Sequence, residues 1–476
     1  MSLFFLRLEP TKLCIKHNYN DRETFEYIMN TSVPLDIEPT PNKIKRAYKY
    51  FYDNLDINKI DFNKILAYVF FIGIELSSDE DEQQIFDTIN SLGVKLSTGE
   101  LLKNRFFDRN TIAFYETSWK ATIESDEECI NYWNNSVTIG RNRVSTMDNF
   151  LYSYIQIKMH DSKIKGLVSA EKKKEFRRFE NLFKSYTELQ AILNCSIHEF
   201  VCEIIEYAII FKERFNQNVL SGEALSANNG LDRLLVLMYG LDVMTLRPYL
   251  LYIEKNVKDV SERNLIYSYI ETYLIRRFIC KTKNNNYSDL FTENMIGQNI
   301  NSYKKLKKYI GEKNVEDSLS MPTNEQFKLG FSNSKMNSNT KARTVLYLME
   351  TKIRNDNKQS TILMAFENYT LEHLMPKNWR KNWNNPELSL EESAKRDEII
   401  LTMGNFAIIS SSLNSSISDG KWSDKLEGNN KDKGLKYYSR GIETMGNVCD
   451  LKVWDEVEIH KRANWLANEA LTIWKV

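Results

Sequence analysis

The residues best suited to chemistry lie in the last quarter of the chain. Glu372 and His373 are adjacent and are followed by Pro376, Asn405 lies 32 residues after His373, and Asn414 lies 9 residues after Asn405. Hydrolysis of a phosphodiester needs a base that takes a proton from water, a group that holds this base in one tautomer, and oxygen ligands for a divalent cation. Imidazole, amide and carboxylate groups supply these functions, and Mg²⁺, which keeps several waters, needs few protein ligands. The set predicts a metal-dependent site that hydrolyses phosphate esters.

Two short strands are expected to position these side chains. One enters Thr370 to His373 and the other spans Leu401 to Ser410, with helices between and after them. A capped helix is expected to begin at Ser389, because Glu392 completes a capping box. Six of the eight tryptophans follow residue 378 and can build a separate aromatic core. The sequence therefore predicts a mixed α+β region at this end.

The rest of the chain is expected to be helical. Ser97 and Glu100 form a capping box for a helix over Leu101 to Phe107, and Gly93 is expected to end the preceding helix. Apolar residues recur at helical spacing in several further segments. These segments are Lys43–Leu55, Phe150–Met159, Lys173–Tyr186, His198–Phe215, Leu231–Tyr239, Leu246–Glu254, Arg263–Cys280 and Ala342–Arg354. The fold class expected for the whole chain is mainly α, with a small α+β domain at the C-terminus.

Composition places limits on the class of protein. The chain has 476 residues, with 64 Lys+Arg against 64 Asp+Glu, so net charge alone gives no case for nucleic acid or membrane binding. The six cysteines form no CxxC pair, and no apolar run approaches the length of a membrane span. We expect a cytoplasmic protein without a membrane partner. Locally, residues 276–358 hold 16 Lys+Arg against 8 Asp+Glu, which predicts a basic surface.

Three blocks of sequence resemble one known family. E-H-x-x-P at Glu372, then Gly404-Asn405 and Leu413-Asn414, then Trp422 and Lys425, resemble the HNH, or His-Me finger, nuclease domain of GmrSD-like type IV restriction enzymes. The likeness continues through Trp454, Arg462, Leu466 and Trp474. Residues 85–97, running into residues 101–104, resemble the N-S-x-G element of that family's N-terminal domain, and residues 273–277 resemble its "yliRR" helix.

The resemblance implies a role for each site residue. His373 would be the general base and Asn405 would position it, while Glu372 and Asn414 would hold Mg²⁺ or Mn²⁺ in a ββα-metal fold. The substrate would be foreign DNA, with a base modification, in defence against phage. The expected DNA contacts are Lys425, Arg276, Arg277, Lys304, Lys305, Lys307 and Lys308.

The expected domains are a remnant of the family's N-terminal domain at residues 1–125, a helical scaffold at 126–339 and the nuclease domain at 340–476. The D-G-Q-Q-R motif that the family carries upstream of its N-S-x-G element does not occur in this sequence. We therefore expect no nucleotide cofactor for this chain alone. A second hypothesis is a truncated or split-gene component that binds DNA and needs a second polypeptide carrying the missing segment.

Purely structural roles remain open for several of these residues. His373 could end a strand before Pro376, and Asn405 and Asn414 could be turn or helix-cap residues. Arg276 and Arg277 could pair with carboxylates of the scaffold. The other histidines, at positions 17, 160, 198 and 460, have no ligand partners at metal-binding spacing.

Overall fold

The structure is a computed structural model, and it divides the chain into two compact units, residues 1–93 and residues 94–476. It describes residues 17, 21–31, 35, 37–38, 40, 42–68, 97–108, 110–139, 142–164, 166–215, 217–283, 286–313, 318–356, 362–383, 388–428 and 433–476. The expected N-S-x-G element at residues 85–96, including the helix end at Gly93, lies outside the described residues.

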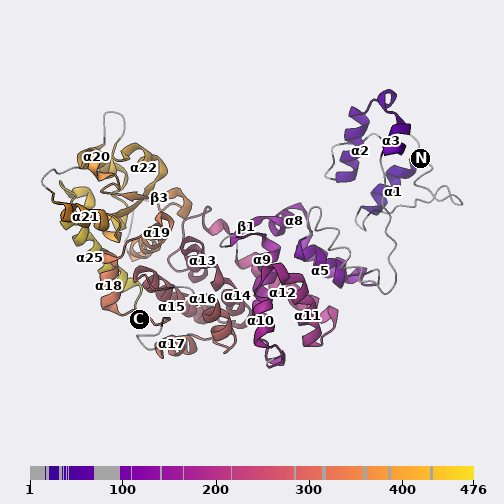
Figure 1. Cartoon of the computed structure of the whole chain (residues 1–476), viewed down its shortest axis with the longest axis horizontal. Coiled ribbons are helices and arrows are strands. Elements are labelled where there is room, and N and C mark those ends of the chain that lie inside the picture. The colour runs from indigo at the N-terminus through magenta and orange to yellow at the C-terminus, as the bar shows by residue number, and fades with distance from the viewer. Residues whose placement is uncertain are drawn as a thin grey trace. The chain divides into compact units, whose positions relative to one another are not determined.

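The described part of the first unit is helical (Figure 1). Its helices are α1 (Arg22–Asn30), α2 (Lys43–Asn54), the 3₁₀ turn η2 (Ile57–Lys59) and α3 (Phe62–Tyr68). Asn42 caps α2 by accepting a hydrogen bond from Lys45 N, which confirms the helix expected from residue 43. Neither α1 nor α2 has a buried residue.

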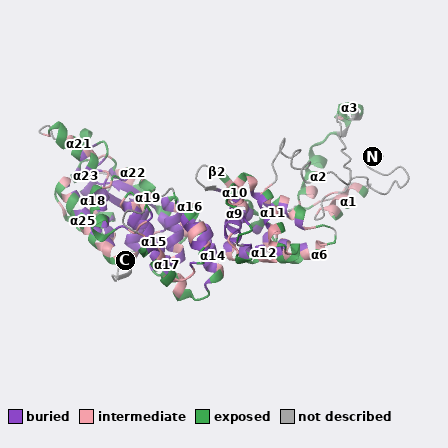
Figure 2. Cartoon of the chain, turned by 60° about the horizontal axis from the view of Figure 1, so that its bottom comes forward, coloured by how far each residue is buried: buried purple, intermediate pink, exposed green. Residues whose placement is uncertain are grey.

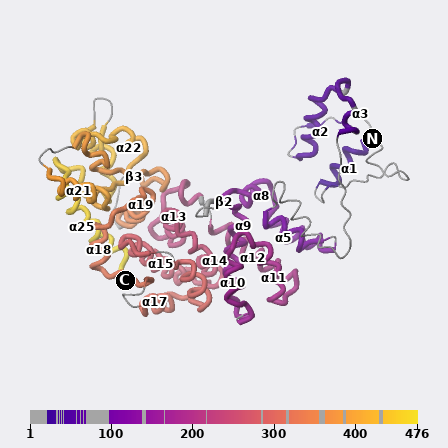
Figure 3. The backbone as a smooth tube through the Cα atoms, in the orientation of Figure 1, coloured from indigo at the N-terminus to yellow at the C-terminus, as the bar shows by residue number. Residues whose placement is uncertain are grey.

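The second unit is mainly helical, as the sequence predicts, and Figure 3 traces its chain from α5 to α25. From residue 98 to 296 its elements are α5 (Thr98–Phe106), α6 (Ile112–Tyr115), η3 (Glu116–Lys120), α7 (Ala121–Ile123), α8 (Glu127–Asn134), β1 (Ser136–Ile139), β2 (Asn142–Ser145), α9 (Thr146–Lys158), η4 (Ser162–Ile164), α10 (Ala170–Phe176), η5 (Phe179–Asn181), α11 (Leu182–Leu193), α12 (Ile197–Arg214), η6 (Gln217–Val219), α13 (Gly230–Leu241), η7 (Met244–Leu246), α14 (Arg247–Asn256), α15 (Val260–Ile279), α16 (Tyr287–Asp289) and η8 (Leu290–Ile296). From residue 303 onward they are α17 (Tyr303–Gly311), α18 (Asn324–Asn333), α19 (Asn339–Asp356), η9 (Phe366–Asn368), β3 (Tyr369–His373), α20 (Trp379–Asn382), α21 (Leu390–Ile399), η10 (Met403–Asn405), β4 (Phe406–Ser410), α22 (Ser411–Ile417), α23 (Trp422–Glu427), α24 (Leu435–Tyr438), η11 (Glu443–Met445), η12 (Val448–Asp450) and α25 (Glu456–Ile473).

Local signals set the ends of several helices. The capping boxes predicted at Ser97 with Glu100 and at Ser389 with Glu392 are both formed. Ser196 with Glu199 and Thr323 with Gln326 make two further capping boxes. Buried residues are concentrated along the helices of this unit, as the colouring of Figure 2 shows.

Two details differ from the sequence expectation. The single helix expected over Lys173–Tyr186 is interrupted between α10 and α11. At the break, the carbonyl oxygens of Phe176 and Arg177 accept hydrogen bonds from the side chains of Gln156 and Tyr152, so tertiary contacts replace helical ones. The antiparallel β1–β2 hairpin was not predicted from the sequence.

The C-terminal region holds the two expected strands, but the second is shorter than the strand predicted at residues 401–410, because Met403–Asn405 form a 3₁₀ turn before it. β3 and β4 pair antiparallel, with His373 opposite Phe406 and Glu372 opposite Ala407, and α22 follows β4 directly. Helix α19 packs against both strands and also against α13 of the helical part. A separate apolar cluster contains Trp379, Trp422 and Trp454, as expected for an aromatic core in this region. The boundaries proposed at residues 125 and 339 stay predictions.

Candidate active site

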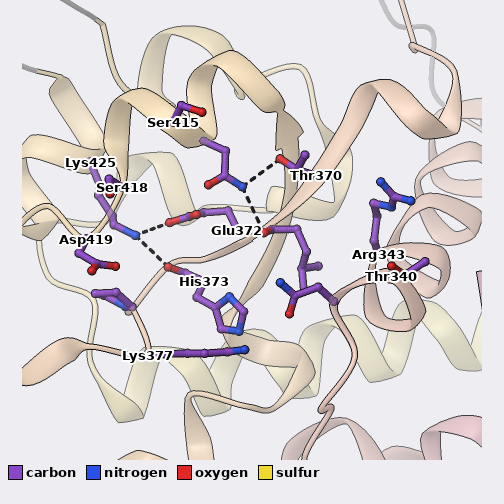
Figure 4. A pocket seen from close by; sticks show the side chains of 14 residues that line it. Thr340, Arg343, Thr370, Glu372, His373, Lys377, Ser415, Ser418, Asp419 and Lys425 are labelled. Atoms are coloured by element: carbon purple, nitrogen blue, oxygen red, sulfur yellow. Dashed lines mark hydrogen bonds and ion pairs between the residues drawn. The ribbon is translucent and has the colours of Figure 1, made fainter.

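A cavity of about 580 Å³ opens beside β3. Its lining comes from the start of α19, from β3 and the loop after it, from α22 with the turn that follows, and from α23. The lining residues are Asn339, Thr340, Arg343, Thr370, Leu371, Glu372, His373, Pro376, Lys377, Asn414, Ser415, Ser418, Asp419 and Lys425 (Figure 4). Four predicted site residues, Glu372, His373, Asn414 and Lys425, therefore share one cavity.

His373 ends β3 with its ring edge-on to Phe406, at 4.8 Å between ring centroids. The side chain is 8% exposed, and its buried Nε2 atom has no hydrogen-bond partner among the described residues. Burial, aided by the nearby charges of Lys377 and Lys425, lowers the pKa of His373 to about 3. The imidazole is therefore neutral at physiological pH, which is the form that can accept a proton.

Asn405 lies under the loop that follows His373. Its Oδ1 atom accepts hydrogen bonds from Met375 N (2.8 Å) and Trp454 Nε1 (3.0 Å), and its Nδ2 donates to the carbonyl oxygens of Met375 (2.8 Å) and Ile400 (2.9 Å). The side chain is fully buried. It therefore holds the loop after the histidine through the main chain and does not contact the imidazole.

The backbone around Asn405 is fixed from the other side by α25. Arg462 donates from Nη1 to the carbonyl oxygens of Gly404 (2.8 Å) and Phe406 (2.7 Å). A Cβ atom at Gly404 would lie 2.2 Å from the carbonyl oxygen of Ile459, so only glycine allows this approach. Burial lowers the pKa of Arg462 to about 9. Gly404, Asn405 and Arg462 thus form a rigid support beneath the strand that carries His373.

Glu372 is buried and forms an ion pair with Lys425, which also donates to the carbonyl oxygen of His373 at 2.9 Å. Burial raises the pKa of Glu372, opposed by Lys425, and burial lowers the pKa of Lys425, opposed by Glu372. Because the Lys425 side chain is 0% exposed, the structure places it at the back of the cavity. This corrects the prediction that Lys425 contacts DNA, because its buried ammonium group neutralises Glu372 instead.

Asn414, on α22, is turned toward β3 by its amide donors. Nδ2 donates to Thr370 Oγ1 at 2.9 Å and to the carbonyl oxygen of Leu371 at 3.2 Å. This leaves the acceptor Oδ1 as the part of the amide that can serve a ligand in the cavity. Asn414 also crosslinks α22 to the strand that carries the other site residues.

The sequence interpretation missed several residues of the cavity. Lys377 is exposed and directly follows Pro376, so its place after the E-H-x-x-P motif was a usable signal. Asp419 lies in the tight turn after α22 and lines the cavity. Ser418 in this turn has a φ of 37°, a conformation that is uncommon for a residue other than glycine. Arg343 reaches the cavity from α19, and no local pattern marks it.

The structure separates Arg276 and Arg277 from this cavity. Each side chain is 1% exposed. Arg276 donates to the carbonyl oxygens of Trp474 and Pro322, and Arg277 donates to those of Ser320, Lys283 and Ser318. The prediction that Arg276 and Arg277 contact DNA phosphates is therefore wrong. Both guanidinium groups are buried and crosslink α15 to other segments of main chain.

The four predicted lysines of α17 are on the surface. Lys304, Lys305, Lys307 and Lys308 are exposed, while Leu306 and Ile310 face the protein interior. Helix α17 packs on α15, and Figures 1 and 2 both show it at the opposite edge of its unit from α22. These lysines stay a prediction as DNA contacts, at a distance from the cavity.

The cavity offers oxygen atoms that could bind a divalent metal ion. Among the described residues, no group of three or more His, Cys, Asp and Glu side chains could hold a metal ion. Mg²⁺ needs only one or two protein carboxylates when waters and amide oxygens complete its shell. The carboxylate of Glu372, Oδ1 of Asn414 and the carboxylate of Asp419 are oxygen donors of this kind among the residues that line the cavity. The donor set therefore fits Mg²⁺ or Mn²⁺.

In the part of the chain that the structure describes, no helix is both long enough and apolar enough to cross a bilayer.

Comparison with known families matches both ends of the chain. A model of the C-terminal domain of the GmrSD restriction endonucleases matches residues 321–469, and a model of the N-terminal domain of the same enzymes matches residues 4–107. A search of curated proteins found no match. The first match contains every residue of the cavity, and the second includes the N-S-x-G element. The two domains support a role as a DNA endonuclease in restriction, and they give no support for a second polypeptide. The chain belongs to the GmrSD restriction endonuclease family.

Proposed function

We propose that this chain is a Mg²⁺-dependent endodeoxyribonuclease that cuts modified foreign DNA in defence against phage, at a cavity of the HNH, or His-Me finger, type. The observation that carries the proposal is the juxtaposition of a neutral histidine, whose Nε2 has no partner among the described residues, with Glu372 and Asn414 on one cavity wall. The family supplies the substrate class, since its members are restriction endonucleases.

His373 is the general base of the proposed reaction. A neutral imidazole accepts a proton from the water that attacks phosphorus, and general base catalysis contributes about 10² to 10⁴ in rate. Phe406 packs edge-on against the ring. Asn405 holds the main chain after His373 at Met375, and Arg462 holds the main chain at Phe406. The ring therefore needs little reorganisation before proton transfer.

Glu372 and Asn414 are the proposed metal ligands, and Asp419, which lines the same cavity, would assist through a water. A bound Mg²⁺ would supply positive charge for the phosphate oxygens and the leaving oxygen. Lys425 holds one oxygen of Glu372 and keeps that side chain oriented. Arg462, Gly404 and Asn405 belong to the support of the site and touch no substrate.

We further propose that cleavage needs no nucleotide. A phosphate cradle is built from backbone N–H groups at a glycine-rich turn or helix start, and the sequence has no G-x-x-x-x-G-K-S/T element. Isothermal calorimetry and phosphate release with ATP, GTP, CTP and UTP test this point. Turnover that is lost on substitution of Asn90 or Lys95 would contradict it.

The experiment for the main proposal is cleavage of supercoiled plasmid and of DNA with glucosylated hydroxymethylcytosine, with and without Mg²⁺. Wild type should cut in Mg²⁺ and stop in EDTA, and should cut the modified DNA faster. The matched control is His460→Ala, because His460 is exposed, lies in the same family domain and does not line the cavity. Loss of cutting in His460→Ala equal to that in His373→Ala, or full cutting in EDTA, would reject the proposal.

A further inference from the structure

The cavity extends beyond the proposed catalytic groups to the first turn of α19. Asn339, Thr340 and Arg343 line this end. Figure 4 shows Arg343 and Thr340 on the side of the cavity away from Lys425 and Asp419. None of the three has a part in the proposed proton transfer or metal binding, so this end of the cavity calls for a separate explanation.

Arg343 is held in place without a carboxylate. Nη1 donates to the carbonyl oxygen of Tyr369 at 2.7 Å, and the guanidinium carbon lies 4.1 Å from the ring centre of Phe366. Its buried Nε has no hydrogen-bond partner, and no ion pair between described residues includes Arg343. Burial lowers the pKa of Arg343, and the nearby Glu367 opposes this shift without cancelling it. A guanidinium nevertheless stays charged in proteins.

This arrangement suits a phosphate group. A planar guanidinium matches two phosphate oxygens, and a fixed orientation means that little side-chain entropy is lost on binding. The N-terminal turn of the 18-residue helix α19 adds positive potential at the same end of the cavity. Lys377, exposed and also without an ion pair among the described residues, lines the cavity near His373.

We propose that Arg343 binds a backbone phosphate of DNA next to the phosphate attacked at His373, and that Lys377 binds the strand on the other side. This inference rests on the proposed function. Both contacts read the backbone and not the bases, so they are independent of sequence and of base modification. They would fix the register of the strand so that one phosphodiester reaches the general base.

Binding is measured separately from cleavage, in the His373→Ala background, by fluorescence anisotropy of a labelled unmodified duplex over a range of salt concentrations. The test variants are Arg343→Gln, which keeps a donor for Tyr369, and Lys377→Gln, whose exposed side chain can be lost without affecting folding. The control is Arg380→Gln. Arg380 also stacks on an aromatic ring, at 4.3 Å from Trp379, but it pairs with Asp397 and does not line the cavity.

Each test variant should bind DNA about tenfold more weakly than the parent, and the slope of log affinity against log salt should fall by about one. Arg380→Gln should match the parent. Unchanged slopes in both test variants, or an equal loss in Arg380→Gln, would overturn the inference. If Arg343→Gln does not fold, Lys377→Gln alone decides it. Wild-type cleavage together with unchanged binding slopes would reject the phosphate contacts and leave the nuclease assignment intact.

Discussion

Two buried ion pairs in this protein differ in what surrounds them. In the helical part, Arg233 donates to both oxygens of Glu271, at 2.8 and 2.5 Å, and also to Thr351 and the carbonyl oxygen of Leu348. Glu271 accepts a further bond from Trp474 Nε1 at 2.8 Å. In the C-terminal region, Lys425 bonds one oxygen of Glu372, and the pair borders a cavity.

The two pairs differ in how fully the protein itself satisfies the hydrogen-bonding groups around them. Around Arg233 the protein itself supplies a partner for each carboxylate oxygen, so these charges stabilise one packing of α13, α15 and α19. Around Glu372 the protein leaves the Nε2 of His373 without a hydrogen-bond partner among the described residues, and Glu372, His373 and Asn414 all line one cavity. A buried polar atom without a partner is costly for stability. In the proposed reaction, the substrate and the metal would bind at these three side chains.

The largest expected effect on stability comes from breaking the scaffold pair. Glu271→Gln leaves Arg233 charged and buried, so the free energy of unfolding should fall by about 3 to 5 kcal/mol. Urea denaturation followed by circular dichroism measures it. Glu391→Gln, which removes an exposed partner of Lys395, is the control and should leave the midpoint unchanged. A Glu271→Gln protein as stable as wild type would mean that the saturated pair is not what holds these helices.

The exposed lysines of α17 should contribute to DNA binding, although the buried Arg276 and Arg277 do not. Reversing Lys304, Lys305, Lys307 and Lys308 to glutamate should flatten the salt dependence of DNA affinity, since each phosphate contact adds about 0.9 to the slope. Anisotropy titrations measure this effect. Replacement of the same four residues by arginine keeps the charge and should keep the slope. An identical slope in the glutamate variant would assign these lysines to a solvated face.

Asn414 tests the proposed metal site. Asn414→Ala removes an oxygen donor, and the Mg²⁺ concentration for half-maximal cleavage should rise by roughly tenfold. Thr370→Val is the matched control, because it removes a partner of the Asn414 amide donors while Oδ1 stays in the cavity. Equal shifts in both variants would show that Asn414 acts only by holding α22 against β3.

A further prediction concerns the pH dependence of stability and a histidine of the helical part. Burial lowers the pKa of His160 to about 4, with Glu293 opposing. The unfolded chain binds a proton near pH 6.5 and the folded chain does not, so stability is lost as pH falls from about 6.5 toward 4, by at most about 1.4 kcal/mol per pH unit. His160→Gln should lose less stability over this range in urea titrations. Parallel curves for the two proteins would contradict the assignment.

Local signals were enough to predict much of the fold. The helix caps at Ser97 and Ser389, and the strands that enter His373 and end at Ser410, were all visible in short stretches of sequence. The β1–β2 hairpin was missed, although Val137 and Val144 flank a glycine at position 140. Elements with clear periodicity or capping chemistry are therefore predictable one segment at a time.

Burial of charged residues was not predictable in the same way. Lys425 and Arg276 were predicted to contact DNA, but their partners Glu372 and Trp474 lie 53 and 198 residues away in sequence. Arg343 reaches the cavity only because α19 packs against β3. Contacts of such long sequence separation leave no periodic pattern in the sequence. Sequence patterns therefore could not distinguish the basic residues that support the fold from those that line the cavity.

The central claim is that the unpaired groups at the cavity serve chemistry and not stability. Cleavage rate and melting temperature, measured on one preparation of His373→Ala, test it most directly. We expect the rate to fall by about 10² to 10⁴, while the protein stays folded and its melting temperature falls only as far as the loss of the buried ring packed against Phe406 requires. Cleavage within roughly threefold of the wild-type rate, on any DNA that wild type cuts, would contradict the claim.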